Sequence, residues 1–299
     1  MSLPRRQERQ WGRHALVDGI PFSLPVNSED SPALMTAFTV DGDAAQALLP
    51  GNEVHAIRLP NRRGLLVVTV IDYRTTDIGR YIEYSIALAC THGPRPASLL
   101  SALVRMRSNG TGQYVWDLPV SSLVSVKGGK GIWGMPKHQA SLDFQVDDRS
   151  MSSQYDLDGR LCMRVTVQRP RGPKVPLKHV GAVNWCAFRG MLMKSSIYVS
   201  DKVQGAVAPF AKAEILLGDH PRMDPLRTLG IGTRPLFTAC LPHSAGVLDD
   251  HLEAWFITSE DPPDPDNPPE GLESVIGLPR SEEWLPPPTS SGRVPGGDR

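Results

Sequence analysis

Apolar and polar residues alternate with a period of two along much of this chain, which is the pattern of strands with one buried face. The stretch 64–74, GLLVVTVIDYR, is nearly continuous in apolar and β-branched residues, and the stretch 81–90, YIEYSIALAC, follows it after a polar turn. The first stretch is typical of a strand buried on both faces. Together they predict a pair of antiparallel neighbours.

A tight hairpin is predicted in the stretch 154–168, QYDLDGRLCMRVTVQ. Asp158 and Gly159 at its centre are residue types that adopt the positive φ angles of a two-residue turn. Apolar residues alternate with polar ones on both sides of this turn, and again in the preceding stretch 141–148, SLDFQVDD. This region therefore predicts a meander of strands.

Three shorter segments have the apolar spacing of helices: 43–51, 97–106 and 246–257. In the first, Asp43 is the expected N-cap and Pro50 ends the helix. In the third, Leu248, Leu252 and Phe256 follow one another at intervals of four residues. Few helices among many strands predict a β-rich fold of the α+β class, with a barrel or bent sheet and the helices packed outside it.

The composition divides the chain into three regions. Residues 1–20 are polar and basic, and we expect a loosely ordered or oligomer-forming arm. Residues 21–258 carry the periodic apolar patterns of one folded domain. Residues 259–299 are dominated by Pro, Asp, Ser and Gly. This tail has too little apolar surface to offset the entropy lost on ordering, so we expect it to be disordered.

Charge and composition narrow the classes of partner. The chain of 299 residues has 32 basic and 32 acidic residues, so its net charge of zero gives no electrostatic basis for binding nucleic acid. No stretch approaches the roughly 18 apolar residues of a membrane span or the core of a secretory signal. The four cysteines are far apart, as in proteins of a reducing compartment. We therefore expect a cytoplasmic protein that binds neither nucleic acid nor a membrane.

Motifs of several common active sites are absent from the sequence. The eight histidines form no H-x-H or H-x-x-x-H pair, and the cysteines form no C-x-x-C pair, so no metal site is predicted. The segment 128–134, GGKGIWG, lacks the spacing of a phosphate-binding loop, and no helix is expected to start after it.

One lysine has surroundings that suit a reactive amine. Lys137 lies in the segment 129–140, GKGIWGMPKHQA, behind apolar residues and next to His138. An amine attacks a carbonyl carbon only without its proton, and the reference pKa of lysine, about 10.4, leaves it protonated at neutral pH. Burial or a neighbouring cation stabilises the neutral form. The glycines let this loop bend so that the lysine points into a cavity, whereas most loop lysines are exposed.

The segment 132–140, IWGMPKHQA, resembles the signature of the acetoacetate decarboxylase superfamily, and Lys137 matches the Schiff-base lysine of that family. The segment 79–90, GRYIEYSIALAC, resembles the family strand with a Tyr-x-Glu motif, so Tyr81 and Glu83 match as well. The resemblance implies a cone-like barrel of mostly antiparallel strands with a few peripheral helices, assembled into homo-oligomers.

The resemblance also implies a chemistry. Lys137 forms an imine with the keto group of a small keto acid, and the imine stabilises a carbanion left by loss of CO2, loss of a proton or aldol cleavage. Glu83 acts as an acid, a base or an orienting carboxylate, and His138 modulates the lysine or relays a proton. No metal and no cofactor is implied. The remaining predicted pocket residues are Tyr81, Trp133 and Met135.

The sequence departs from the family pattern at three positions. His138 stands where the decarboxylases have a second lysine, Ser31 lies near the position of their carboxylate-binding arginine, and Val68 lies near that of a further glutamate. Glu83 is either solvent-facing, by the two-residue period of a strand, or directed into a cavity. The sequence leaves open a decarboxylase, an aldolase or dehydratase, and a non-catalytic protein that binds a small ligand on the same fold.

Overall fold

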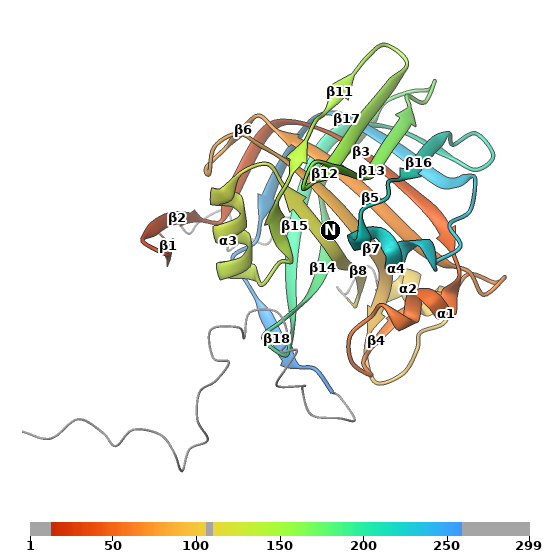
Figure 1. Ribbon diagram of the computed structural model, residues 1–299, viewed down its shortest axis with the longest axis horizontal. Coiled ribbons are helices and arrows are strands. Elements are labelled where there is room, and N and C mark those ends of the chain that lie inside the picture. Colours follow the sequence, from red (N-terminus) through yellow and green to blue (C-terminus); the bar gives the residue numbers. More distant parts are fainter. Residues whose placement is uncertain (1–12, 106–109, 259–299) are drawn as a thin grey trace, which may run out of the picture.

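The computed structural model describes residues 13–105 and 110–258, and seven long strands of this part close into a barrel (Figure 1). Strand β8 pairs again with β7, which closes the ring. The helices lie outside it, so the predicted β-rich barrel with peripheral helices is confirmed. In order around the barrel the strands are β7 (Tyr81–His92), β5 (Gly64–Tyr73), β3 (Val26–Val40), β17 (Pro235–Leu248), β15 (Met191–Val207), β14 (Val175–Phe188) and β8 (Thr111–Val120).

Neighbouring strands of the barrel are antiparallel at six of the seven contacts. The predicted pair is among them, because β5 and β7 match over eight residue pairs. The seventh contact, between β14 and β8, is parallel and joins two residue pairs, Asn184 with Gln113 and Trp185 with Tyr114. The barrel is therefore closed by its shortest strand contact.

A second sheet covers the outer face of β5 and β7. Asp158 (φ 51°) and Gly159 (φ 73°) make the turn between two of its strands, so the predicted hairpin is confirmed. Buried side chains from both sheets, such as Val68 and Val165, form one core, and each stabilises the fold by about 1.5–3 kcal/mol. The strands of this sheet are β10 (Ser141–Leu142), β11 (Gln145–Val146), β12 (Ser150–Leu157), β13 (Arg160–Gln168) and β16 (Ala213–Leu217).

Both faces of β5 are covered, as its nearly continuous apolar sequence predicts. Leu66, Val68 and Val70 point outward into the core beneath the second sheet. Thr69 and Ile71, which alternate with them, point into the barrel. The strand therefore forms part of the wall between the core and the barrel interior.

The predicted N-cap of the first helix is wrong by two residues. Asp41 caps α1, since its Oδ1 accepts hydrogen bonds of 2.9 Å from the backbone N–H groups of Asp43 and Ala44. The helical segments are α1 (Gly42–Ala47), α2 (Leu99–Arg105), α3 (Leu123–Trp133), the 3-10 turn η2 (Pro221–Met223) and α4 (Asp224–Arg227). The remaining short strands of the large sheet are β4 (Val54–Ala56), β6 (Thr75–Thr76), β9 (Lys137–Gln139) and β18 (Glu253–Phe256).

The helix predicted at 246–257 is also wrong. Its first residues end β17 at Leu248, and β18 follows after a turn and pairs with β15. The apolar residues of this segment are four apart, and four is close to the helix period but is also a multiple of the strand period of two. Spacing alone therefore did not distinguish the two structures.

A hairpin near the N-terminal end of the described residues packs against α3. It consists of β1 (Arg13–Val17) and β2 (Ile20–Leu24), with Asp18 and Gly19 at positive φ in the turn. Asp18 pairs with Lys127 of α3. Part of the segment 1–20, for which the sequence predicts an arm, is thus a strand, whereas residues 1–12 and the predicted tail 259–299 lie outside the described residues.

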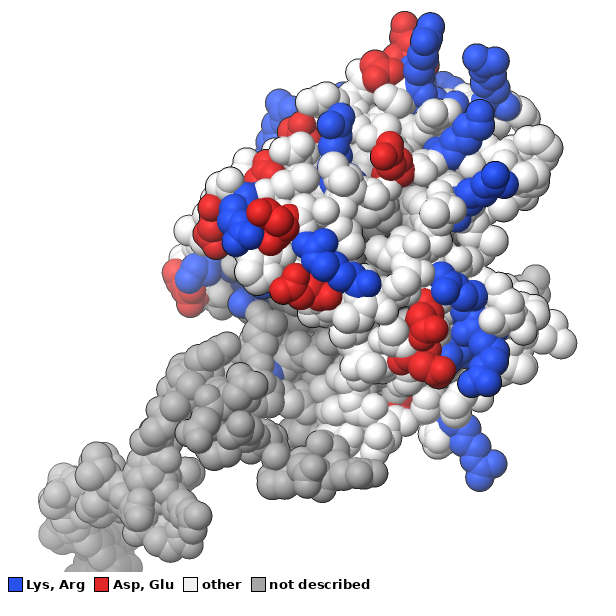
Figure 2. All heavy atoms as spheres, turned by 45° about the vertical axis from the view of Figure 1, so that its right-hand side comes forward, with Lys and Arg blue, Asp and Glu red and all other residues white. Residues whose placement is uncertain are grey.

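Basic and acidic side chains lie interspersed on the face of the molecule that Figure 2 shows, in keeping with their equal numbers. All four cysteines are buried, and they form no disulfide bond with one another. Among the described helices, none combines the length and the apolar character needed to cross a membrane.

Candidate active site

The interior of the barrel contains a cavity of about 140 Å³. Each of the seven barrel strands contributes at least two of the residues that line it, and most of its surface is apolar. For comparison, an engineered protein cavity of about 150 Å³ binds benzene. The barrel interior is therefore large enough for a ligand of about six non-hydrogen atoms.

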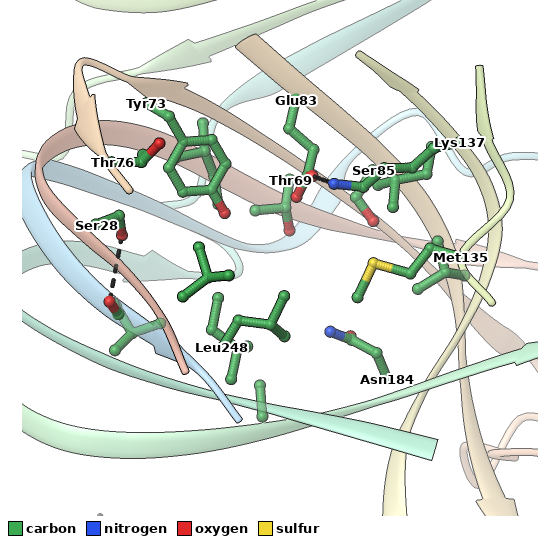
Figure 3. A pocket seen from close by; sticks show the side chains of 18 of the residues that line it. Ser28, Thr69, Tyr73, Thr76, Glu83, Ser85, Met135, Lys137, Asn184 and Leu248 are labelled. Carbon is green, nitrogen blue, oxygen red and sulfur yellow. Dashed lines mark hydrogen bonds and ion pairs between the residues drawn. The ribbon is translucent and has the colours of Figure 1, made fainter. Parts of the chain in front are cut away.

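Lys137 reaches into this cavity from β9, which pairs in parallel with the end of β8. Its side chain is only 4% exposed. The Nζ atom lies 2.7 Å from Oε2 of Glu83, a contact shown in Figure 3, and 2.9 Å from Oγ of Ser125. It also lies 5.4 Å from the ring centre of Tyr81. The amine is thus buried among a carboxylate, a hydroxyl group and an aromatic ring.

Glu83 enters the cavity from β7. Tyr81, Glu83 and Ser85 alternate along this strand and face the barrel interior, whereas Tyr84 packs into the core beneath the second sheet. Of the two orientations that the sequence leaves open for Glu83, the structure has the inward one. Its carboxylate can therefore exchange a proton with the amine of Lys137 across 2.7 Å.

Two stacked phenol rings flank this ion pair. Tyr73 and Tyr81 both line the cavity, and their ring centres are 4.6 Å apart. Burial, and after it the nearby charge of Glu83, raise the pKa of both phenols well above the usual value. Both hydroxyl groups therefore keep their protons at neutral pH, and they form hydrogen bonds within the site, Tyr73 with Glu83 and Tyr81 with Ser125.

Of the two predicted pocket residues that precede Lys137, Met135 lies in the cavity wall and Trp133 lies outside it. Trp133 is not among the lining residues, because it is buried in a neighbouring cluster with Val115, and its Nε1 donates a hydrogen bond of 2.9 Å to the carbonyl oxygen of Asp249. The prediction for Trp133 is thus wrong, and this side chain anchors the end of α3 to the barrel.

His138 does not face the cavity, because neighbouring residues of β9 point to opposite sides of the strand. Its Nε2 lies 3.0 Å from the hydroxyl group of Tyr155, and its Nδ1 lies 3.5 Å from Oδ1 of the buried Asp117. Burial lowers the pKa of His138, although the charge of Asp117 acts in the opposite direction. The predicted role of His138 beside the imine is therefore corrected: it belongs to a polar cluster outside the barrel, where Arg222 also contacts Asp117.

The glycine-rich segment before Lys137 is a helix rather than the expected loop. Helix α3 includes Gly128, Gly129 and Gly131, and it ends at Gly134, which has a φ of 64°. A Cβ atom on Gly129 would lie 2.6 Å from Cε of Lys137 and would also overlap with its Cδ. The absence of a side chain at Gly129 therefore makes room for the lysine.

We expect Gly129→Ala to displace Lys137 while keeping helix α3, since alanine favours a helix over glycine by about 1 kcal/mol. The variant should lose most of its reactivity at Lys137, measured as labelling of the lysine by a carbonyl compound and borohydride. Gly131→Ala is the matched control because its Cβ would press on Val17 of the hairpin instead. Equal labelling of the Gly129 and Gly131 variants would contradict this role of Gly129.

The cavity also holds polar residues that the sequence analysis does not single out. No local motif marks these residues. The strand period shows that they face the cavity only once the pairing of the barrel strands is known. Within residues 13–105 and 110–258, no group of three or more His, Cys, Asp or Glu side chains lies close enough to hold a metal ion. The polar residues concerned are Ser28, Thr69, Tyr73, Thr76, Ser85, Gln113 and Asn184.

Several solved structures share this fold. An acetoacetate decarboxylase from Legionella pneumophila matches with a TM-score of 0.57 at 13% identity, over 83% of this chain and 90% of that one. The enduracididine biosynthesis enzyme MppR, complexed with pyruvate, matches with a TM-score of 0.55 at 16% identity, over 77% and 90%. An acetoacetate decarboxylase-like enzyme from Sphingomonas wittichii RW1 has a TM-score of 0.55 and 14% identity, over 78% and 94%.

The sequence itself was also compared with known proteins. No curated protein matches the chain. The model of the acetoacetate decarboxylase family matches residues 6–235, a range that includes Glu83 and Lys137. This range is more than half of the chain, and the similar structures have the same barrel. The chain therefore belongs to the acetoacetate decarboxylase family.

Proposed function

We propose that this protein is a cofactor-independent lyase that forms a Schiff base between Lys137 and a small keto acid. Membership of the family supports an enzyme of the lyase kind or a related one. The observation that carries the finer proposal is the ion pair between Lys137 and Glu83, which lies buried in the barrel cavity of about 140 Å³.

The first chemical step is a proton transfer from the ammonium group of Lys137 to Glu83. This transfer crosses the 2.7 Å between the two side chains and converts the ion pair into two neutral groups. The neutral amine then attacks the keto carbon, and the keto oxygen takes up a proton to give a carbinolamine. Glu83 lies next to the reacting nitrogen and can supply that proton.

Loss of water from the carbinolamine gives a protonated imine on Lys137. Glu83 first takes a proton back from the nitrogen of the adduct and then donates it to the hydroxyl group, which leaves as water, so that its carboxylate faces the cationic imine. The imine accepts the electron pair of a neighbouring bond, so that CO2, a proton or an aldehyde can leave. The enamine that remains takes up a proton at carbon to become an imine again, and hydrolysis of this imine by water returns the free lysine.

A small keto acid fits the cavity in size and in chemistry. Pyruvate has six non-hydrogen atoms and acetoacetate has seven, close to the size of ligand that a cavity of about 140 Å³ admits. MppR, which has the same fold, is complexed with pyruvate in its solved structure. These two facts support the choice of pyruvate and acetoacetate as the first compounds to test.

The proposal is tested by incubating the protein with pyruvate or acetoacetate, adding borohydride and analysing its peptides by mass spectrometry. Borohydride reduces an imine to a stable amine, so we expect one adduct, located on Lys137. Folded protein that forms no adduct with either compound would contradict the proposal and would favour the non-catalytic binding protein on this fold.

A further inference from the structure

Two amide side chains meet inside the barrel where its ring closes. Gln113 on β8 and Asn184 on β14 are partners in the short parallel contact, and both line the cavity. The Nε2 atom of Gln113 donates a hydrogen bond of 2.9 Å to Oδ1 of Asn184. This bond fixes which end of the Asn184 amide is available to a ligand.

Asn184 presents only hydrogen-bond donors to the cavity. Its oxygen is occupied by Gln113, and Figure 3 shows its nitrogen directed into the cavity. The side-chain nitrogen carries two N–H groups, and it meets no acceptor among the described residues. A ligand group that completes this site must therefore supply acceptor atoms.

A second donor in the same cavity also lacks a partner. The hydroxyl oxygen of Thr69 is buried and has no hydrogen-bond partner among the described residues. Thr69 on β5 pairs with Ser85 on β7, and Ser85 is two residues from Glu83 along that strand. Buried polar atoms without partners are rare in folded proteins, so the Thr69 hydroxyl group, together with the donors of Asn184, favours a ligand with acceptor oxygens.

We propose that Asn184 binds the carboxylate of the keto acid and that Gln113 is the positioning residue that holds the Asn184 amide in this orientation. The inference rests on the proposed function, which places the keto carbon at Lys137. A carboxylate is an acceptor only, so it matches a group that offers donors only. Hydrogen bonds to a charged acceptor are also about twice as strong as those between neutral groups.

Strand β8 links this site to the lysine. It holds Gln113 near one end, and near the other it pairs with β9 through Leu118 and Lys137. One strand therefore sets the positions of the amine and of the amide that orients the acid group. The arrangement selects a substrate by the presence of an acid group as well as by its keto group.

The test compares acetoacetate with acetoacetamide, which has the same number of non-hydrogen atoms but an amide in place of the carboxylate, and with acetone, which has neither. The concentration giving half-maximal borohydride labelling of Lys137 is measured for each. The wild-type protein should favour acetoacetate over acetoacetamide. Asn184→Asp should raise the half-maximal concentration of acetoacetate roughly ten- to hundredfold, because the carboxylate of the ligand then meets a second carboxylate. Labelling by acetone should stay unchanged.

Asn184→Asp should also reverse the preference, since the new carboxylate accepts a hydrogen bond from the amide group of acetoacetamide. A general loss of packing would weaken labelling by all three compounds alike and could not reverse the preference between acetoacetate and acetoacetamide. Asn61→Asp is the matched control, because it adds the same charge at an exposed turn and keeps the oxygen that accepts from the N–H of Arg63.

Gln113→Glu tests the positioning role without changing the residue that touches the ligand. A carboxylate at this position only accepts hydrogen bonds, so Asn184 must turn its nitrogen toward it and its oxygen into the cavity. The variant should therefore lose the preference for acetoacetate, as Asn184→Asp does. Wild-type preferences in both variants would overturn the inference and leave the proposed function standing.

If the folded wild-type protein is labelled by none of the three compounds and not by pyruvate either, the proposed function fails. Binding of acetoacetate, measured by ligand-observed NMR, then decides the inference separately. Acetoacetate should bind the wild-type protein and not Asn184→Asp. Equal binding to both proteins, or binding to neither, would overturn the role of Asn184.

Discussion

Lys137→Ala is expected to abolish borohydride labelling and to reduce turnover of any keto acid that the wild-type protein converts by about 10⁴-fold or more. The variant has no amine in the cavity, so no imine can form there. The protein should still fold, because Glu83 can take up a proton when its partner is lost and so avoid an unpaired buried charge. Mass spectrometry and thermal unfolding measure the two outcomes.

Lys127→Ala serves as the control for Lys137→Ala. Lys127 lies on α3 and pairs with Asp18 on the surface, outside the cavity. This variant should label like the wild-type protein. Wild-type turnover in a folded Lys137→Ala variant would remove the Schiff-base mechanism altogether.

Glu83→Gln is expected to slow imine formation by roughly 10²- to 10⁴-fold, the usual contribution of a positioned acid or base. Glutamine keeps the size of the side chain and can still accept a hydrogen bond from Lys137, but it cannot take the proton that the amine must lose. The substitution should also lower the pKa values of Tyr73 and Tyr81, since the charge of Glu83 raises them. Stopped-flow labelling and a spectroscopic titration of tyrosine measure these effects.

Glu29→Gln, at an exposed position of β3, controls for the loss of one negative charge. It should leave both the labelling rate and the tyrosine titration unchanged. If Glu83→Gln labels as fast as this control, the proton passes to another group and Glu83 only holds the lysine in place.

The parts of the fold that were predicted correctly have strong local signals. Asp158 and Gly159 specify a tight turn by themselves, and the apolar stretch 64–74 can only be a buried strand or a helix segment. The position of Glu83 depended on the family resemblance, because the strand period alone permits either face. The closed barrel makes one of these faces the cavity.

The parts that were missed depend on contacts between distant segments. Helix α3 is rich in glycine, which disfavours a helix, but Gly129 is needed there because Lys137 passes over it. His138 follows the lysine directly and yet lies on the other side of β9. Asn184 and Gln113 are 71 residues apart and belong to no motif, so only the closing of the barrel brings them together.

The parallel contact between β14 and β8 also has a kinetic consequence. With two residue pairs against eight between β5 and β7, it is the place where the ring should open most readily, and the backbone amides beside it should exchange with deuterium faster than those of the other barrel strands. A keto acid held by Lys137 and Asn184 would span this opening. Bound substrate should therefore slow the exchange of backbone amides on both strands.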